Sequence, residues 1–271
     1  MRRSCRDICR PGRRHPPPFD EGSRVRVLAL CAAAFSAAFL SFADAARAGG
    51  VNLTWSPATP LACYSEQVRY VEPFACDQNE GRHVAVASFL LDADVPDFEG
   101  LELVVDVWSV DSPLPNWWQF FNAGSCRRPA LTASADFGAA TQTQCVPIPG
   151  APPQGGVTAY LTPTTYPPLS GNPNQARLKA GFLAPQPLTL VHGVEYYGAA
   201  FVIDNQKTVG SGACSGCTMP VVLILNSVRL ASQTMSVTLQ DPVQEGAIFW
   251  QRTFPTAAPN LTWGAIKSLY H

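Results

Sequence analysis

The sequence is poor in charged residues and especially poor in basic ones. Only 14% of the 271 residues are Asp, Glu, Lys or Arg, and the whole chain holds three lysines and four histidines. Nine of the arginines precede residue 49, so that 10 basic and 16 acidic residues remain after that point. Nucleic acids and anionic membrane surfaces are bound through basic patches. This composition therefore excludes nucleic acid as a partner and argues against electrostatic attachment to a membrane.

After residue 49 the sequence also lacks any apolar run of the roughly 20 residues that cross a bilayer as a helix. The one extended run of the whole chain, Val27–Phe42, is shorter, follows arginine-rich sequence and precedes Ala46-Arg47-Ala48, which fits a small-x-small cleavage site. This order predicts a cleaved signal peptide rather than a retained anchor. We expect residues 1–48 to form an extension and a signal, and residues 49–271 to form one secreted domain, in the periplasm, at the cell surface or outside the cell.

Six of the nine cysteines follow the predicted signal, and an even set in an exported chain indicates a disulfide framework. Neighbours in the sequence are the simplest partners, because each such bridge would close a local loop. The favoured bridges are therefore the three local ones: Cys63 with Cys76, Cys126 with Cys145, and Cys214 with Cys217. Other pairings of the six cysteines stay open.

The pattern of apolar residues is that of β-strands. Leu101, Leu103, Val105 and Val107 fall on alternate positions, as expected for a strand with one buried face. Ten segments show strand character: Val51–Trp55, His83–Leu91, Leu101–Val110, Trp117–Phe121, Leu131–Ala135, Ala176–Phe182, Glu195–Asn205, Val221–Leu230, Ser236–Leu239 and Ile248–Gln251.

Strands without intervening helices exclude a parallel α/β sheet. We therefore predict a single all-β domain, an antiparallel β-sandwich of immunoglobulin-like or jelly-roll-like type that disulfides stabilise. The stretch Val146–Asn174 holds eight prolines and reads as a long connection. A short C-terminal helix is expected at Thr262–Tyr270, with Thr262 as its N-cap.

Several sequence pieces, in this order, resemble a group of uncharacterised secreted bacterial β-rich proteins. The matching pieces are GVNLTW at Gly50–Trp55, FAC at Phe74–Cys76, NWWQF at Asn116–Phe120, AGSCR at Ala123–Arg127, KTVGSGACSGC at Lys207–Cys217, VLILNSVRL at Val222–Leu230 and TWGAIKSLY at Thr262–Tyr270. Members of this group often carry a cysteine where this chain has Val222, and another near the C-terminus. The resemblance implies secretion and a β domain, and it implies no activity.

The spacing Cys214-Ser-Gly-Cys217 is that of redox dithiols, which place the motif at the N-terminus of a helix. Here the motif lies between two predicted strands, so that a structural bridge is the favoured interpretation. A zinc site would need a second pair of ligands. His83 and His192, the candidate bases of a hydrolytic enzyme, are expected to be structural, because each lies beside a strand or a turn.

Asp92, Asp94 and Asp97 cluster between two predicted strands and are weak candidates for calcium ligands. Their spacing does not match an EF-hand, and a solvated acidic turn is the favoured interpretation. We expect no metal and no other cofactor.

The adjacent residues Trp117 and Trp118 are the candidate ligand-binding side chains. On a strand they would point to opposite faces. One indole would then lie in the core, and the other, if exposed, could stack on a sugar ring. The favoured interpretation is that both are buried, in the core and under a covering loop.

Together these features favour a secreted or cell-surface protein that is not an enzyme and has a binding or structural role, with a ligand that the sequence does not identify. Its partner would be a glycan or another surface protein. A carbohydrate-binding module that uses an exposed tryptophan is the first alternative. A thiol-redox or hydrolytic enzyme is the second and the least favoured.

Overall fold

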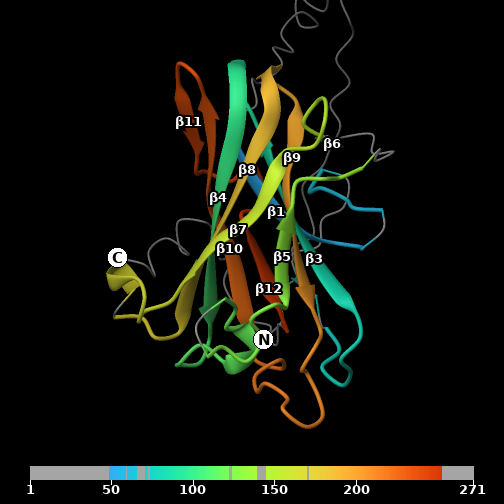
Figure 1. Cartoon of the computed structure of the whole chain (residues 1–271), viewed down its shortest axis with the longest axis vertical. Helices are drawn as coiled ribbons and strands as arrows, with labels where there is room; N and C mark the ends of the chain where they lie inside the picture. The colour runs from blue at the N-terminus through green and yellow to red at the C-terminus, as the bar shows by residue number, and fades with distance from the viewer. Residues whose placement is uncertain are drawn as a thin grey trace, which may run out of the picture. The chain divides into compact units, whose positions relative to one another are not determined.

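The computed structural model describes residues 49–251, apart from residues 59, 66–70, 73, 122–123, 139–144 and 170. The predicted signal in residues 1–48 and the predicted helix Thr262–Tyr270 lie outside the described residues. Within them, strands form two sheets that pack face to face (Figure 1). None of the described helices has both the length and the apolar character to cross a bilayer.

The smaller sheet is built around a central strand that pairs on both sides. Its order is β1 (Gly50–Ser56), β3 (Arg82–Leu90), β9 (Glu195–Asp204) and β5 (Leu131–Ser134), and β6 (Cys145–Val146) also pairs with β9. All pairs are antiparallel except β6 with β9. The register sets Asn52 opposite Ser88 and joins Cys145 to the first residue of β9, Glu195.

The larger sheet is dominated by three long strands. Its order is β2 (Val71–Glu72), β12 (Ala247–Trp250), β10 (Val221–Ser232), β4 (Val95–Ser109), β8 (Gln175–Leu190) and β7 (Gln154–Leu161), with β11 (Ser236–Leu239) on β10. The strands run antiparallel, apart from β2, which is parallel to β12.

The core lies between the two sheets. The alternating residues of β4 that the sequence assigned to a buried face, Leu101, Leu103, Val105 and Val107, are all buried there. They meet inward side chains of the smaller sheet such as Leu53. The prediction of an antiparallel β-sandwich with disulfides is confirmed.

The proline-rich stretch Val146–Asn174 was expected to be a long connection, and this is wrong in its middle. Strand β7 occupies Gln154–Leu161, a run that contains no proline, and a short 3₁₀ helix follows at Pro167–Leu169. Gly155 lets β7 approach β8 closely, because a Cβ atom at this position would lie 1.9 Å from the carbonyl oxygen of Gly181.

The predicted strand Trp117–Phe121 is also wrong. Asn116–Trp118 forms one turn of 3₁₀ helix, which follows Pro115 with its extended backbone angles φ −60° and ψ 150°. Proline fixes its own φ and offers no backbone donor to a sheet. The two prolines at 113 and 115 therefore lead the chain out of the sheet before the aromatic residues are reached.

Candidate functional site

The six cysteines after the predicted signal form three disulfides, as expected, but the expected pairing is wrong. The bridges are Cys63–Cys145, Cys76–Cys217 and Cys126–Cys214, with sequence separations of 82, 141 and 88 residues. The sandwich brings together segments that are far apart in the chain. For this reason, distance along the sequence was a poor guide to distance in space.

The two cysteines of the C-x-x-C motif bind two different segments. Cys214 joins Cys126 and Cys217 joins Cys76, so that both bridges fasten the loop between β9 and β10. Backbone hydrogen bonds hold the same loop: the N–H of Trp117 donates to the carbonyl of Ser215 at 2.9 Å. The predicted bridge within the motif does not form, and its cysteines serve as two separate anchors.

Trp117 and Trp118 are both 0% exposed, which agrees with the favoured interpretation that both are buried and contradicts the alternative that one of them is exposed. The 3₁₀ turn, unlike a strand, directs both indoles into the core. Their ring centroids lie 4.8 and 5.3 Å from that of Trp250. The indole N–H of Trp117 donates to Thr208 Oγ1 at 3.0 Å. Neither indole therefore offers a stacking surface to a ligand.

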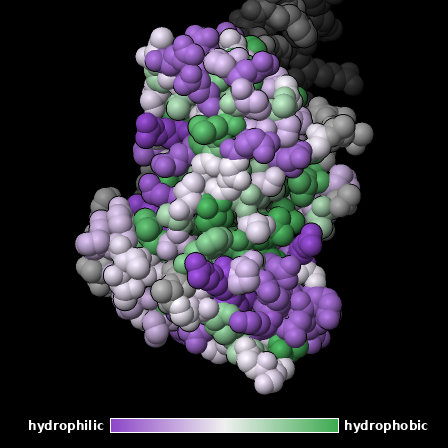
Figure 2. Space-filling view, viewed as in Figure 1, coloured by the Kyte–Doolittle hydropathy of each residue, from purple (hydrophilic) through white to green (hydrophobic). Residues whose placement is uncertain are grey.

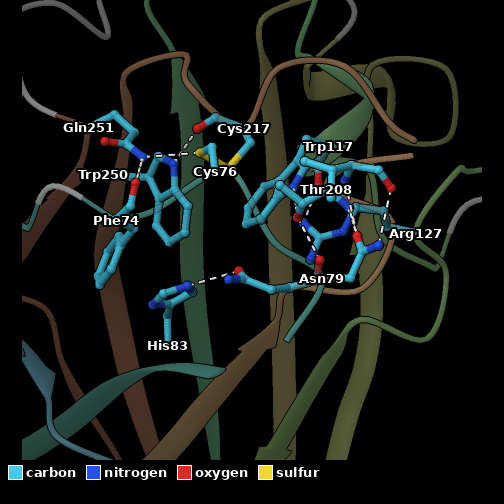
Figure 3. Close-up of a disulfide and its surroundings, with 12 residues drawn as sticks. Phe74, Cys76, Asn79, His83, Trp117, Arg127, Thr208, Cys217, Trp250 and Gln251 are labelled. Carbon is cyan, nitrogen blue, oxygen red and sulfur yellow. Dashed lines mark hydrogen bonds between the residues drawn. A yellow bond between two sulfur atoms is a disulfide. The ribbon is translucent and has the colours of Figure 1, made fainter. Parts of the chain in front are cut away.

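The disulfide Cys76–Cys217 and the side chain of Arg127 lie beside an aromatic cluster that includes Phe74, Trp117 and Trp250 (Figure 3). The Trp250 indole N–H donates to the carbonyl of Cys217 at 2.6 Å. The Gln251 amide donates to the carbonyl of Phe74 and lies 3.2 Å from Cys76 Sγ. Aromatic packing and covalent bonds thus stabilise the same end of the sandwich.

Arg127 is fully buried, which composition and motifs did not predict. Its guanidinium carbon lies 3.5 Å from the ring centroid of Trp117. The group donates to three backbone carbonyls: that of Gln206 at 3.0 Å, that of Trp117 at 2.9 Å, and that of Asp204. Burial lowers the pKa of Arg127 to about 9. The only sequence signal was its place directly after a cysteine.

The two histidines of the described chain lie at opposite ends of the β3–β9 pair. His83 Nε2 lies 2.8 Å from Asn205 Oδ1, and its ring lies 4.1 Å from that of Phe74. Burial lowers the pKa of His83. His192, in the turn before β9, is exposed and bonds Asp94 through its backbone N–H and Nδ1. The two histidines therefore do not share a site.

The acidic residues named as calcium candidates do not converge. Asp94 accepts both hydrogen bonds from His192, and these bonds lower the pKa of the Asp94 carboxyl. Within the described ranges, one group of three possible ligand residues is close enough to share a metal: Cys63, Cys145 and Glu195. Its two cysteines are bonded to each other. The structure therefore gives no support to a calcium site at Asp92, Asp94 and Asp97.

One apolar hollow of about 450 Å³ crosses the outer face of the larger sheet. Its lining includes Gly100, Gly155 and Gly181, which lack side chains, and Leu183, which is 70% exposed. In Figure 2, hydrophobic surface likewise gathers across the middle of the displayed face, with hydrophilic surface above and below it.

Comparison with known proteins gives little further information. No protein-family model matches the chain, and no curated protein matches it. One solved structure that aligns is titled "Crystal structure of Putative membrane anchored protein from Corynebacterium diphtheriae". The aligned residues are 11% identical, the TM-score is 0.25, and the match covers 78% of this chain and 38% of the other. This likeness carries no argument about function.

Proposed function

We propose that this chain works outside the cytosol as a non-catalytic, disulfide-locked protein with a binding or structural role. The observation that carries the proposal is the set of three bridges between distant segments. Structural disulfides form and persist in oxidising compartments and are rare in reducing ones. The signal-like segment before residue 49 agrees with export to the periplasm, the cell surface or the medium.

The bridges close long loops, which favours a stabilising role. In the chain-entropy model, closing a loop of 82 to 141 residues stabilises the fold by about 4–5 kcal/mol. A domain of this size has a large core of its own, so such reinforcement suits a protein that must persist without chaperones. The two bridges on one loop also hold the end of the sandwich in a fixed shape.

The side chains that the sequence analysis considered for redox or hydrolytic catalysis of an external substrate serve structure instead, which supports a role other than that of an enzyme. The cysteines of the C-x-x-C motif are bonded to other segments, and His83 is stacked in the aromatic cluster. The carbohydrate-binding alternative lacks the exposed indole that it requires, because Trp117 and Trp118 are both buried. No specific observation favours either alternative.

The test is to produce the full chain in a bacterium that exports it and to separate cytosol, periplasm, membranes and medium. We expect the protein outside the cytosol, with a processed N-terminus. Non-reducing peptide mapping should recover the three bridges that the structure shows. A protein that stays in the cytosol with free thiols would refute the proposal. If the protein is exported, retention on the cells would indicate a role at the cell surface, and release into the medium would indicate a soluble role.

A further inference from the structure

Three polar residues lie together on the outer face of the smaller sheet. Asn52, Ser88 and Glu195 belong to the adjacent strands β1, β3 and β9 (Figure 1). Asn52 and Ser88 are direct partners across the β1–β3 register. Their exposures are 2% for Asn52, 0% for Ser88 and 9% for Glu195. A buried carboxylate is costly unless hydrogen bonds or charges compensate it, so this placement requires an explanation.

One oxygen of the carboxylate contacts both neighbours. The Ser88 hydroxyl donates to Glu195 Oε1 at 2.5 Å, and Asn52 Nδ2 donates to the same atom at 3.1 Å. The hydroxyl of Ser65 donates to the other oxygen, Oε2, and orients the group. Glu195 is therefore placed to take a proton from the serine and to pass it to the amide nitrogen.

The carbonyl of the Asn52 side chain is polarised from its other side. Asn52 Oδ1 accepts hydrogen bonds from the backbone N–H groups of Gln244 at 3.0 Å and Glu245 at 3.4 Å. Two backbone donors on one carbonyl oxygen stabilise the negative charge that develops there when a nucleophile attacks the carbon.

The cluster thus combines the parts of an acyl transfer: a hydroxyl nucleophile, a base in contact with it, and an activated carbonyl. Asn52 and Ser88 are direct cross-strand partners, whose Cβ atoms are typically about 4.5–5.5 Å apart, so the hydroxyl and the amide carbon are near neighbours. The buried bridge Cys63–Cys145 lies against Glu195, within 4.8 Å. The low exposure of all three residues of the cluster limits the access of water that would hydrolyse an acyl product.

We propose that Ser88 and Asn52 form an intramolecular ester, with Glu195 as the base and then the acid. Ser88 Oγ attacks Cγ of Asn52 and gives its proton to Glu195. The resulting oxyanion is held by the N–H groups of Gln244 and Glu245. The C–N bond then breaks, Glu195 returns the proton to the leaving nitrogen, and ammonia departs. The step consumes no oxidant, reductant or added co-reactant.

The ester would join β1 to β3 covalently. β1 is the first strand after the predicted cleavage site, and it lies at one end of its sheet, where the segment around Asp241 also bonds it. A strand at the end of a sheet, held by hydrogen bonds and packing without a covalent bond, is among the first to detach when a fold opens. The bond would make this strand inseparable from the sheet.

The experiment uses the full chain, exported by a bacterial host, then reduced and alkylated before mass spectrometry. We expect the intact mass to be lower than that of the processed sequence by one ammonia. We also expect one linked pair of peptides that contain Asn52 and Ser88, which hydroxylamine separates, because it cleaves esters. Recovery of the two peptides only in unlinked form, at full mass, would overturn the proposal.

Two serine variants in the same sheet form a matched pair. Ser88→Ala removes the nucleophile and should abolish both the mass loss and the linked peptide. Ser134→Ala changes an exposed serine of β5, at the opposite edge of the sheet from β1, and should keep them. A cyclic imide at Asn52 would lose the same mass, but it would persist in Ser88→Ala, and that result would refute the ester. The Cys63–Cys145 bridge in each variant reports that the sheet has folded, and the wild-type peptide map decides the question if a variant does not fold.

Discussion

Replacing Arg127 by Ala tests the energetic role of the buried guanidinium. The substitution leaves three enclosed carbonyl oxygens without their donor and removes a cation from the face of Trp117. Each unsatisfied buried acceptor costs about 1–3 kcal/mol, and a desolvated cation–π contact is worth about 2 kcal/mol. Removing the buried charge returns several kcal/mol of desolvation free energy. We expect the free energy of unfolding to fall by about 2–4 kcal/mol.

The assay is denaturant unfolding at neutral pH, followed by the fluorescence of the buried tryptophans. The neighbouring Arg128 is exposed and provides the control, since Arg128→Ala should change stability by less than about 0.5 kcal/mol. Arg127→Lys keeps a charge but cannot donate to all three carbonyls in the geometry of a guanidinium. Its free energy of unfolding should therefore lie nearer to that of the alanine variant than to that of wild type. If Arg127→Ala and Arg128→Ala unfold at the same denaturant concentration, the guanidinium does not stabilise this end of the sandwich.

Three further predictions concern the same domain. Trp117→Ala and Trp118→Ala should both lower stability by about 3–5 kcal/mol through cavity formation, and a melting temperature unchanged in either would contradict its burial. Burial lowers the pKa of His83 below its usual 6.5, so the unfolded chain binds the proton first and stability should fall as the pH drops through 6.5. His83→Gln should flatten that pH dependence in denaturation at several pH values. Gly155→Ala should destabilise by about 1–3 kcal/mol because its Cβ would meet the backbone of β8, while Gly171→Ala has open space and should be neutral by thermal melting.

The parts of the fold that could be predicted are those in which the signal is local. Alternation along Leu101–Val107 marks a strand wherever that strand lies in the molecule, and the core confirms it. The strand β7 was missed because prolines on both sides of Gln154–Leu161 hid a short run that contains none. The prediction of a connection relied on the number of prolines in the whole stretch and overlooked that none of them lies within Gln154–Leu161.

The arrangement of the candidate site residues depends on the backbone conformation and on contacts between distant segments, which no local sequence pattern shows. Whether Trp117 and Trp118 point to opposite faces depends on the backbone, and a single 3₁₀ turn after Pro115 reverses the expectation. The pairing of Cys214 and Cys217 depends on which segments the two sheets bring to one end.

The polar cluster shows the same dependence. Asn52 and Glu195 are 143 residues apart, and only the order β1–β3–β9 brings them together. No spacing rule applies to such a set, because each residue comes from a different strand and no single motif contains more than one of them.

The covalent bonds are distributed in a way that links the two proposals. Strand β9 begins at Glu195, beside the bridge Cys63–Cys145, and ends at Asp204, where the loop fastened by Cys76–Cys217 and Cys126–Cys214 begins. The bridges join segments that flank both ends of this central strand and so oppose local opening there. An ester between β1 and β3 would add a covalent bond between two strands that none of the three bridges joins directly. A protein outside the cell, without chaperones to refold it, gains most from suppressing such local opening, because proteases cleave chains in the opened state.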